Sequence, residues 1–94
     1  MAYITVSHWA CEIWNDELEA IARDKYIPLI MSVGASKAQM IRTGELAFCV
    51  VTEYSDGQAA QAAQERIAEI RSQAAEEMPM TMTSSHGGEV FVHS

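Results

Sequence analysis

The segment Glu45–Tyr54, with the sequence ELAFCVVTEY, constrains the fold more than any other part of the chain. Successive side chains of an extended chain point to opposite faces, and here both faces are largely apolar. Leu46, Phe48 and Val50 form one face, and Ala47, Cys49 and Val51 form the other. A strand of this kind lies in the interior of a sheet and needs a layer of protein on each side.

Three further extended segments accompany this strand. The β-branched and aromatic residues of Tyr3–Ala10 predict a first strand. Residues 36–42 are also extended, and Thr43-Gly44 between them and Glu45 predicts a tight hairpin turn. Gly87-Gly88 precedes a last short strand, which we expect at Glu89–His93.

A first helix is predicted between the first strand and the hairpin. Either Asn15 or Asp16 can cap its N-terminus, because both side chains accept hydrogen bonds from free backbone N–H groups. Pro28 lies within the helical pattern and predicts a kink or a break. Gly34 is the expected stop.

A second helix is predicted over Ala59–Glu77. Ser55 and Gln58 have capping-box spacing at its start, and Pro79 ends it. A narrow apolar stripe of mostly small residues comprises Ala59, Ala63, Ile67, Ile70, Ala74 and Met78. The following Met80–Ser85 segment fits either an extended arm or a loop.

The order strand, helix, strand, strand, helix, strand predicts one α+β domain over residues 1–94 with the ferredoxin-like fold. Its antiparallel sheet has the spatial order 4-1-3-2, with both helices on one face. The apolar side chains of the other face need a cover as well. The simplest cover is a second copy of the same sheet, so we predict a homodimer through this face.

Composition excludes several classes of protein. Thirteen acidic residues against six basic ones give a net charge of -7, which disfavours binding to nucleic acid. No apolar run is long enough to span a membrane, and no secretory signal is recognisable, so we expect a cytoplasmic protein. Cys11 and Cys49 lack metal or redox spacing and are expected to be buried thiols. No cofactor or metal motif is present, and we expect neither group.

The chain resembles the dimeric α/β-barrel superfamily, which includes antibiotic-biosynthesis monooxygenases and stress-responsive small proteins. The resemblance rests on the helix that ends in Gly34, the Arg42-Thr43-Gly44 hairpin, the Val50–Tyr54 strand end and the capped second helix. It implies dimerisation through the sheets, with Met80–Ser85 suited to an arm that reaches the partner. The resemblance implies no set of catalytic residues that can be matched residue by residue to this chain.

Six residues are candidates for a ligand site: His8, Trp9, Trp14, Tyr26, Tyr54 and His86. The two tryptophans flank the junction of the first strand and first helix, where they form either an aromatic wall for a planar ligand or the end of the core. The two tyrosines supply hydroxyls to the same cavity or are core aromatics.

The histidines have an alternative interpretation of their own. His8, His86 and Glu89 would have the ligand types of a metal or haem-contacting site, or of a general-base pair, if the last strand brings them together. Otherwise they are unrelated residues, and His93 is expected near Tyr3.

Two functional hypotheses remain from the sequence. The first is a dimer that binds a small hydrophobic or aromatic molecule between sheet and helices. The second is a cofactor-independent monooxygenase that acts on an aromatic or polyketide-like substrate in the same cleft, with the substrate itself activating oxygen.

Overall fold

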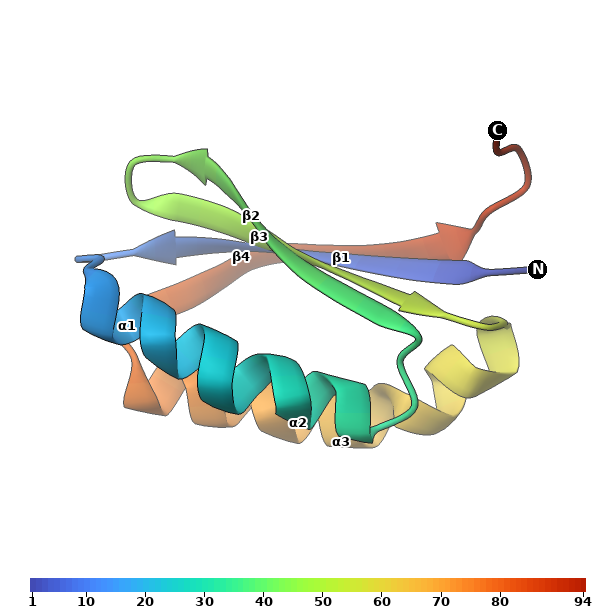
Figure 1. The fold of residues 1–94 in the computed structure, drawn as a ribbon, viewed down its shortest axis with the longest axis horizontal. Coiled ribbons are helices and arrows are strands. Elements are labelled where there is room, and N and C mark those ends of the chain that lie inside the picture. The colour runs from blue at the N-terminus through green and yellow to red at the C-terminus, as the bar shows by residue number, and fades with distance from the viewer.

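The computed structural model describes residues 1–94 as a four-stranded antiparallel sheet with one layer of helices on one side (Figure 1). Its elements in chain order are β1 (Tyr3–Cys11), α1 (Asp16–Ile21), η1 (Ala22–Tyr26), α2 (Ile27–Ser32), β2 (Lys37–Gly44), β3 (Ala47–Tyr54), α3 (Gly57–Glu77) and β4 (Met80–Glu89). The strands lie in the order β2-β3-β1-β4. The predicted ferredoxin-like fold and its 4-1-3-2 strand order are confirmed.

The first helix is one rod built from α1, the π-helical segment η1, and α2. Asn15 is its cap, because the Asn15 side chain accepts a hydrogen bond of 2.9 Å from the Leu18 backbone N–H. The rod continues past Pro28, which lies in the first turn of α2. The Ile27 N–H bonds to the Ala22 carbonyl five residues back, and this wider turn precedes the residue that lacks a backbone donor.

The predicted break at Pro28 is therefore wrong, and the irregularity of the helix is the π-helical segment that precedes the proline. Gly34 ends the helix as predicted. Its φ of 106° is a conformation that L side chains rarely adopt.

The second helix, α3, begins two residues earlier than predicted. Its cap is Asp56, whose side chain accepts a hydrogen bond of 2.8 Å from the Ala59 N–H. The predicted capping box of Ser55 and Gln58 is therefore wrong, because the carboxylate one residue later takes the capping position. The apolar stripe is confirmed, since Ala63, Ile70, Ala74 and Met78 are buried, and Ala59 and Ile67 pack against the core.

The hairpin turn lies two residues beyond its predicted position at Thr43-Gly44. Gly44 pairs with Ala47, so β2 extends through Gly44 and the turn is formed by Glu45 and Leu46. The register also shifts between Arg42 and Gly44, which places one extra residue in β2.

The last strand differs most from expectation. Strand β4 covers Met80–Glu89, so the segment left open as an arm or a loop is strand, and the strand predicted at Glu89–His93 is wrong. Backbone pairing with β1 joins Cys11 to Met80 and Tyr3 to Glu89, and backbone groups form such a ladder whatever side chains they carry. Residues 91–94 form an exposed tail.

The core lies between the sheet and the helices. Thirteen buried residues form a single cluster there, with Tyr26 and Tyr54 the most completely enclosed large side chains. Both cysteines are free and buried, as predicted, and burial raises the pKa of the Cys11 thiol.

The face of the sheet away from the helices, here called the open face, carries apolar side chains that no second layer covers. Ile41 is 45% exposed there, whereas Cys49 is only 7% exposed because it lies between Ile41 and His8 in the register. Cys49 is thus buried within a single chain, although the sequence predicts that the apolar side chains of this face need a cover from a second copy. No helix combines the length and apolarity that a membrane crossing needs.

Candidate functional site

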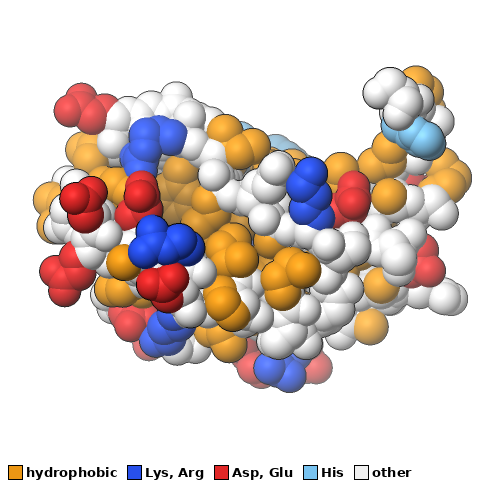
Figure 2. Space-filling view, viewed as in Figure 1, with side chains coloured by type: hydrophobic (Ala, Val, Ile, Leu, Met, Phe, Trp, Pro, Cys, Tyr) orange, Lys and Arg blue, Asp and Glu red, His pale blue; other side chains and the backbone are white.

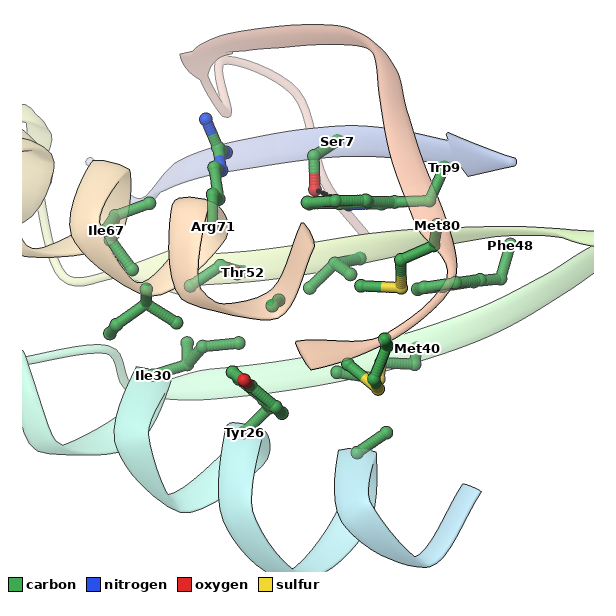
Figure 3. Close-up of a pocket in the computed structure, with 15 residues that line it drawn as sticks. Ser7, Trp9, Tyr26, Ile30, Met40, Phe48, Thr52, Ile67, Arg71 and Met80 are labelled. Atoms are coloured by element: carbon green, nitrogen blue, oxygen red, sulfur yellow. Dashed lines mark hydrogen bonds between the residues drawn. The ribbon is translucent and has the colours of Figure 1, made fainter. Parts of the chain in front are cut away.

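A mostly apolar cavity lies between the sheet and the helices (Figure 3). Twelve of its fifteen lining residues are hydrophobic, and its volume is about 40 Å³. The polar lining residues are Ser7, Thr52 and Arg71. A water molecule needs about 10–15 Å³ of such volume, so the cavity has room for about three or four waters and for no larger molecule without rearrangement.

One wall of the cavity consists of aromatic rings from the two central strands. Trp9 and Phe48 face each other across β1 and β3 as register partners, and their rings are stacked with centroids 6.3 Å apart. The Trp9 Nε1–H donates a hydrogen bond of 2.9 Å to the Ser7 Oγ. Because this bond satisfies the indole, the wall offers a ligand a flat apolar surface.

Three methionines line the same cavity: Met40, Met78 and Met80. A methionine side chain has three rotatable bonds and adapts to irregular space. These side chains are the part of the lining that can move when a ligand enters.

Tyr26 closes the helical side of the cavity and is 2% exposed. Its hydroxyl donates to the Glu77 Oε1 at 2.5 Å, and the Lys25 Nζ lies 2.8 Å from the same oxygen. Burial, followed by the hydrogen bond to Glu77, raises the pKa of Tyr26. The hydrogen bonds from Lys25 and Tyr26 lower the pKa of Glu77. This cluster joins η1 to the end of α3.

Arg71 is the one charged residue in the cavity lining, and its side chain forms no hydrogen bond or ion pair with the rest of the chain. Burial lowers the pKa of its guanidinium. Nearby Tyr54 is 1% exposed, and burial raises the pKa of its hydroxyl while the charge of Arg71 opposes that change. A half-buried cation without an anion is costly unless a ligand supplies one.

A wide, polar groove of about 900 Å³ adjoins the cavity along the first half of α3. Ile67 and Arg71 line both spaces, so they form the partition between them. Tyr54 and His86 border the groove as well. A ligand that reaches the cavity from this side would pass Arg71.

A third hollow, of about 400 Å³, lies between the first helix and the edge strand β2, and it includes Trp14 and Arg42. The Arg42 guanidinium lies 5.2 Å from the Trp14 ring centre. The buried Trp14 Nε1 has no hydrogen-bond partner. Figure 2 shows hydrophobic side chains exposed between charged ones on this side of the molecule, around the gap between sheet and helices.

The six predicted site residues do not form one site. Trp9 and Tyr26 line the cavity, Tyr54 lines the groove, and Trp14 lines the hollow beside β2. His8 and His86 lie next to each other, with ring centroids 5.7 Å apart, and His86 also borders the groove.

The predicted partners of the histidines lie away from them. Glu89 pairs with Tyr3, at the opposite end of β1 from His8, so its inclusion in a cluster with His8 is wrong. His93 lies in the exposed tail, because the strand ends at Glu89, and the one hydrogen bond of its ring is with the Ser94 carbonyl. No three His, Cys, Asp or Glu side chains gather closely enough to hold a metal ion.

The sequence interpretation missed Arg71. This residue follows Ile67 by four positions and precedes Ala74 by three, so it belongs to the buried stripe of α3. A lone cation on an otherwise apolar helix stripe was the signal that could have found it.

Solved structures with the same architecture were found by comparison. They include a dimeric ferredoxin-like protein from an uncultured marine organism, with 14% sequence identity, a TM-score of 0.69, and coverage of 99% of this chain and 98% of that one. SnoaB, a cofactor-independent oxygenase from Streptomyces nogalater, has 10% identity and a TM-score of 0.72 over 98% and 95% of the two chains.

The chain has the ferredoxin-like fold of these proteins. A monooxygenase from the gene ActVA-Orf6 of Streptomyces coelicolor, in complex with the ligand Nanaomycin D, is also similar, with 15% identity and a TM-score of 0.63 over 99% and 92% of the chains. The ferredoxin-like fold that the resemblance implied is thus confirmed. No protein-family model and no curated protein sequence matches the chain.

Proposed function

We propose that this protein is a homodimer that binds a small aromatic molecule with an acidic group in the cavity between its sheet and helices. The observation that carries the proposal is the unpaired Arg71 at the wall of an otherwise apolar cavity. An aromatic body would lie against Trp9 and Phe48, and its anionic group would take a charge-assisted hydrogen bond from the guanidinium.

The present cavity volume of about 40 Å³ demands that the lining move. A cavity that binds benzene has about 150 Å³. Rotation of the cavity methionines, or displacement of Ile67 toward the groove, would supply this space. The protein would therefore bind by induced widening of the cavity.

A titration calorimetry experiment with 1-naphthoate tests the proposal. Ala74 lines the cavity, and Ala74→Val adds two methyl groups to a space that has little room. We expect naphthoate to bind the native protein and to bind this variant more weakly. Ala75→Val is the matched control, since Ala75 is exposed on the same helix. Failure of the native protein to bind naphthoate and related aromatic acids would refute the ligand proposal.

The second copy is proposed to cover the open face. The apolar side chains left uncovered there support this part, as does the similarity to a solved dimeric ferredoxin-like protein. Two apolar sheet faces pack at about 10 Å to form one shared core. Sedimentation at micromolar concentration measures the mass, and a stable monomer of 10.4 kDa would refute the dimer.

A cofactor-independent monooxygenase is the second candidate function. Its support is the fold shared with SnoaB and with the monooxygenase from ActVA-Orf6, together with a cation placed to stabilise a deprotonated substrate. In such a reaction a substrate CH₂ group and O₂ give a carbonyl group and water, with all electrons taken from the substrate. An oxygen electrode with a panel of aromatic quinols and anthrones tests it, and no oxygen uptake above the protein-free rate would refute it.

A further inference from the structure

His8 on β1 and His86 on β4 lie together on the open face, away from the proposed ligand cavity. Ser7 and Trp9 line the cavity, so the intervening His8 points to the opposite face of β1. His86 pairs with Val6, which shares this face with His8. The two imidazoles are neighbours, with centroids 5.7 Å apart and ring planes at 63°.

A β-bulge creates this neighbourhood. Trp9 pairs with Met82 and His8 with Ser84, so Thr83 is an extra residue in β4. If Thr83 paired with His8 in a regular ladder instead, each later residue of β4 would move one position along β1, and His86 would lie opposite Thr5, whose side chain belongs to the face that carries the helices. The Thr83 hydroxyl donates a hydrogen bond of 3.2 Å to the His8 carbonyl and so fixes the bulge.

Neither imidazole is used by the rest of the chain. Neither imidazole forms a hydrogen bond, and the Thr83 hydroxyl reaches only the backbone carbonyl of His8. Neither ring takes part in an ion pair. His8 is partly buried and His86 is exposed within one chain, so their ring nitrogens are free for a ligand; in the proposed dimer this ligand would lie at the interface with the second copy.

We propose that His8 and His86 together bind a divalent transition-metal ion that prefers imidazole ligands, such as Zn²⁺. With metal–nitrogen distances of about 2.0–2.1 Å and about 1.2 Å from nitrogen to ring centre, two imidazoles on one ion have centres roughly 5–6 Å apart. The observed separation of 5.7 Å lies within this range. The chain supplies two ligands, because no third His, Cys, Asp or Glu side chain joins them. Water, or groups of a second copy on the same face, fill the other positions.

Calorimetric titration of the intact protein with Zn²⁺ at neutral pH tests the site. We expect His86→Gln and His8→Gln each to weaken Zn²⁺ binding by at least about tenfold, since a single imidazole forms no chelate. His93→Gln is the matched control, because His93 lies in the exposed tail and its loss leaves the affinity unchanged. Absence of Zn²⁺ binding to the native protein, or equal affinity in all three variants, would overturn the proposal.

Two further measurements distinguish metal ligation by the two imidazoles from effects of the substitutions on the rest of the protein. Imidazole ¹⁵N chemical shifts of His8 and His86, but not those of His93, should change on addition of Zn²⁺. Deletion of Thr83 removes only the unpaired residue, so Ser84 still pairs with His8 and His86 still lies opposite Val6. A folded deletion variant should therefore keep the shift changes, and their loss would overturn the geometry. Naphthoate binding should be the same in the His8→Gln variant as in the native protein, because His8 lines neither the cavity nor the groove, and this keeps the test independent of the proposed ligand cavity.

Discussion

Replacement of Arg71 by methionine is expected to separate stability from ligand binding. Methionine keeps an unbranched apolar stem and removes only the guanidinium. Because Arg71 has no hydrogen-bond or ion-pair partner, no buried polar group is orphaned by the change. The free energy of unfolding should therefore change by less than about 0.5 kcal/mol or should increase, because the substitution breaks no hydrogen bond or ion pair and removes a partly desolvated charge.

The ligand affinity should respond differently. A hydrogen bond to a charged group contributes about 1.5–3 kcal/mol, so loss of the guanidinium should weaken 1-naphthoate binding by roughly 10- to 100-fold. The methyl ester of naphthoate lacks the carboxylate charge and should bind both proteins equally.

Denaturant unfolding followed by calorimetric titration measures both quantities on the same samples. Arg66→Met is the control, because Arg66 is exposed on the same helix and lines neither the cavity nor the groove. The reasoning would be refuted by an Arg71→Met variant that loses more than about 1 kcal/mol of stability while its naphthoate affinity is unchanged. Arg71 would then be a structural residue of the core boundary.

Three other changes address the interface, the acid response and the core. Val51→Asp places a carboxylate on the open face and should leave a folded monomer in sedimentation, whereas Ala62→Asp on the exposed side of α3 should leave the dimer intact. Because the pKa of Glu77 is lowered in the folded state, its carboxylate stabilises the fold above the ordinary pKa of the group, and this stabilisation is lost as the pH falls through the lowered value. Tyr26→Phe removes one of the hydrogen bonds that lower this pKa, so the free energy of unfolding should fall less steeply with acid in the variant than in the native protein. An identical pH profile would contradict this role. Phe48→Ala should destabilise the fold by about 3–5 kcal/mol in denaturant unfolding, and a loss below about 1 kcal/mol would show that the aromatic wall is not part of the core.

The sequence predicted the parts of the fold that depend on periodicity. The two-faced apolar pattern of β3, the small-residue stripe of α3 and the Gly34 stop all follow from local chemistry, and together they specify the strand order. The last strand was misplaced because the Ser, His and Gly residues near its end have low strand propensity. Pairing with the free edge of β1 overrides that propensity, and only the folded sheet supplies that edge.

The site was less predictable than the fold for a geometric reason. Trp9 and Tyr26 reach the cavity, as one of the two interpretations predicted. Arg71 belongs to the cavity lining because α3 packs its apolar stripe against the sheet, and this contact is visible only in the folded structure. The meeting of His8 and His86 depends on a single bulged residue, Thr83, which shifts the side chains of the rest of β4 to the opposite face. A shift of one residue in register has no local signature in composition or spacing.

The strand order also sets the sequence of events by which the chain can fold. Strand β1 is synthesised first, yet both of its neighbours, β3 and β4, come later, and β4 ends at Glu89. The hairpin of β2 and β3 and the helix α3 can form from nearby residues, whereas the pairing of β1 with β4 waits for contacts between the two ends of the chain. Until β4 is in place, β1 keeps an unpaired edge and Trp9 lacks part of its cover, so we expect the nascent chain to be most prone to association in that interval.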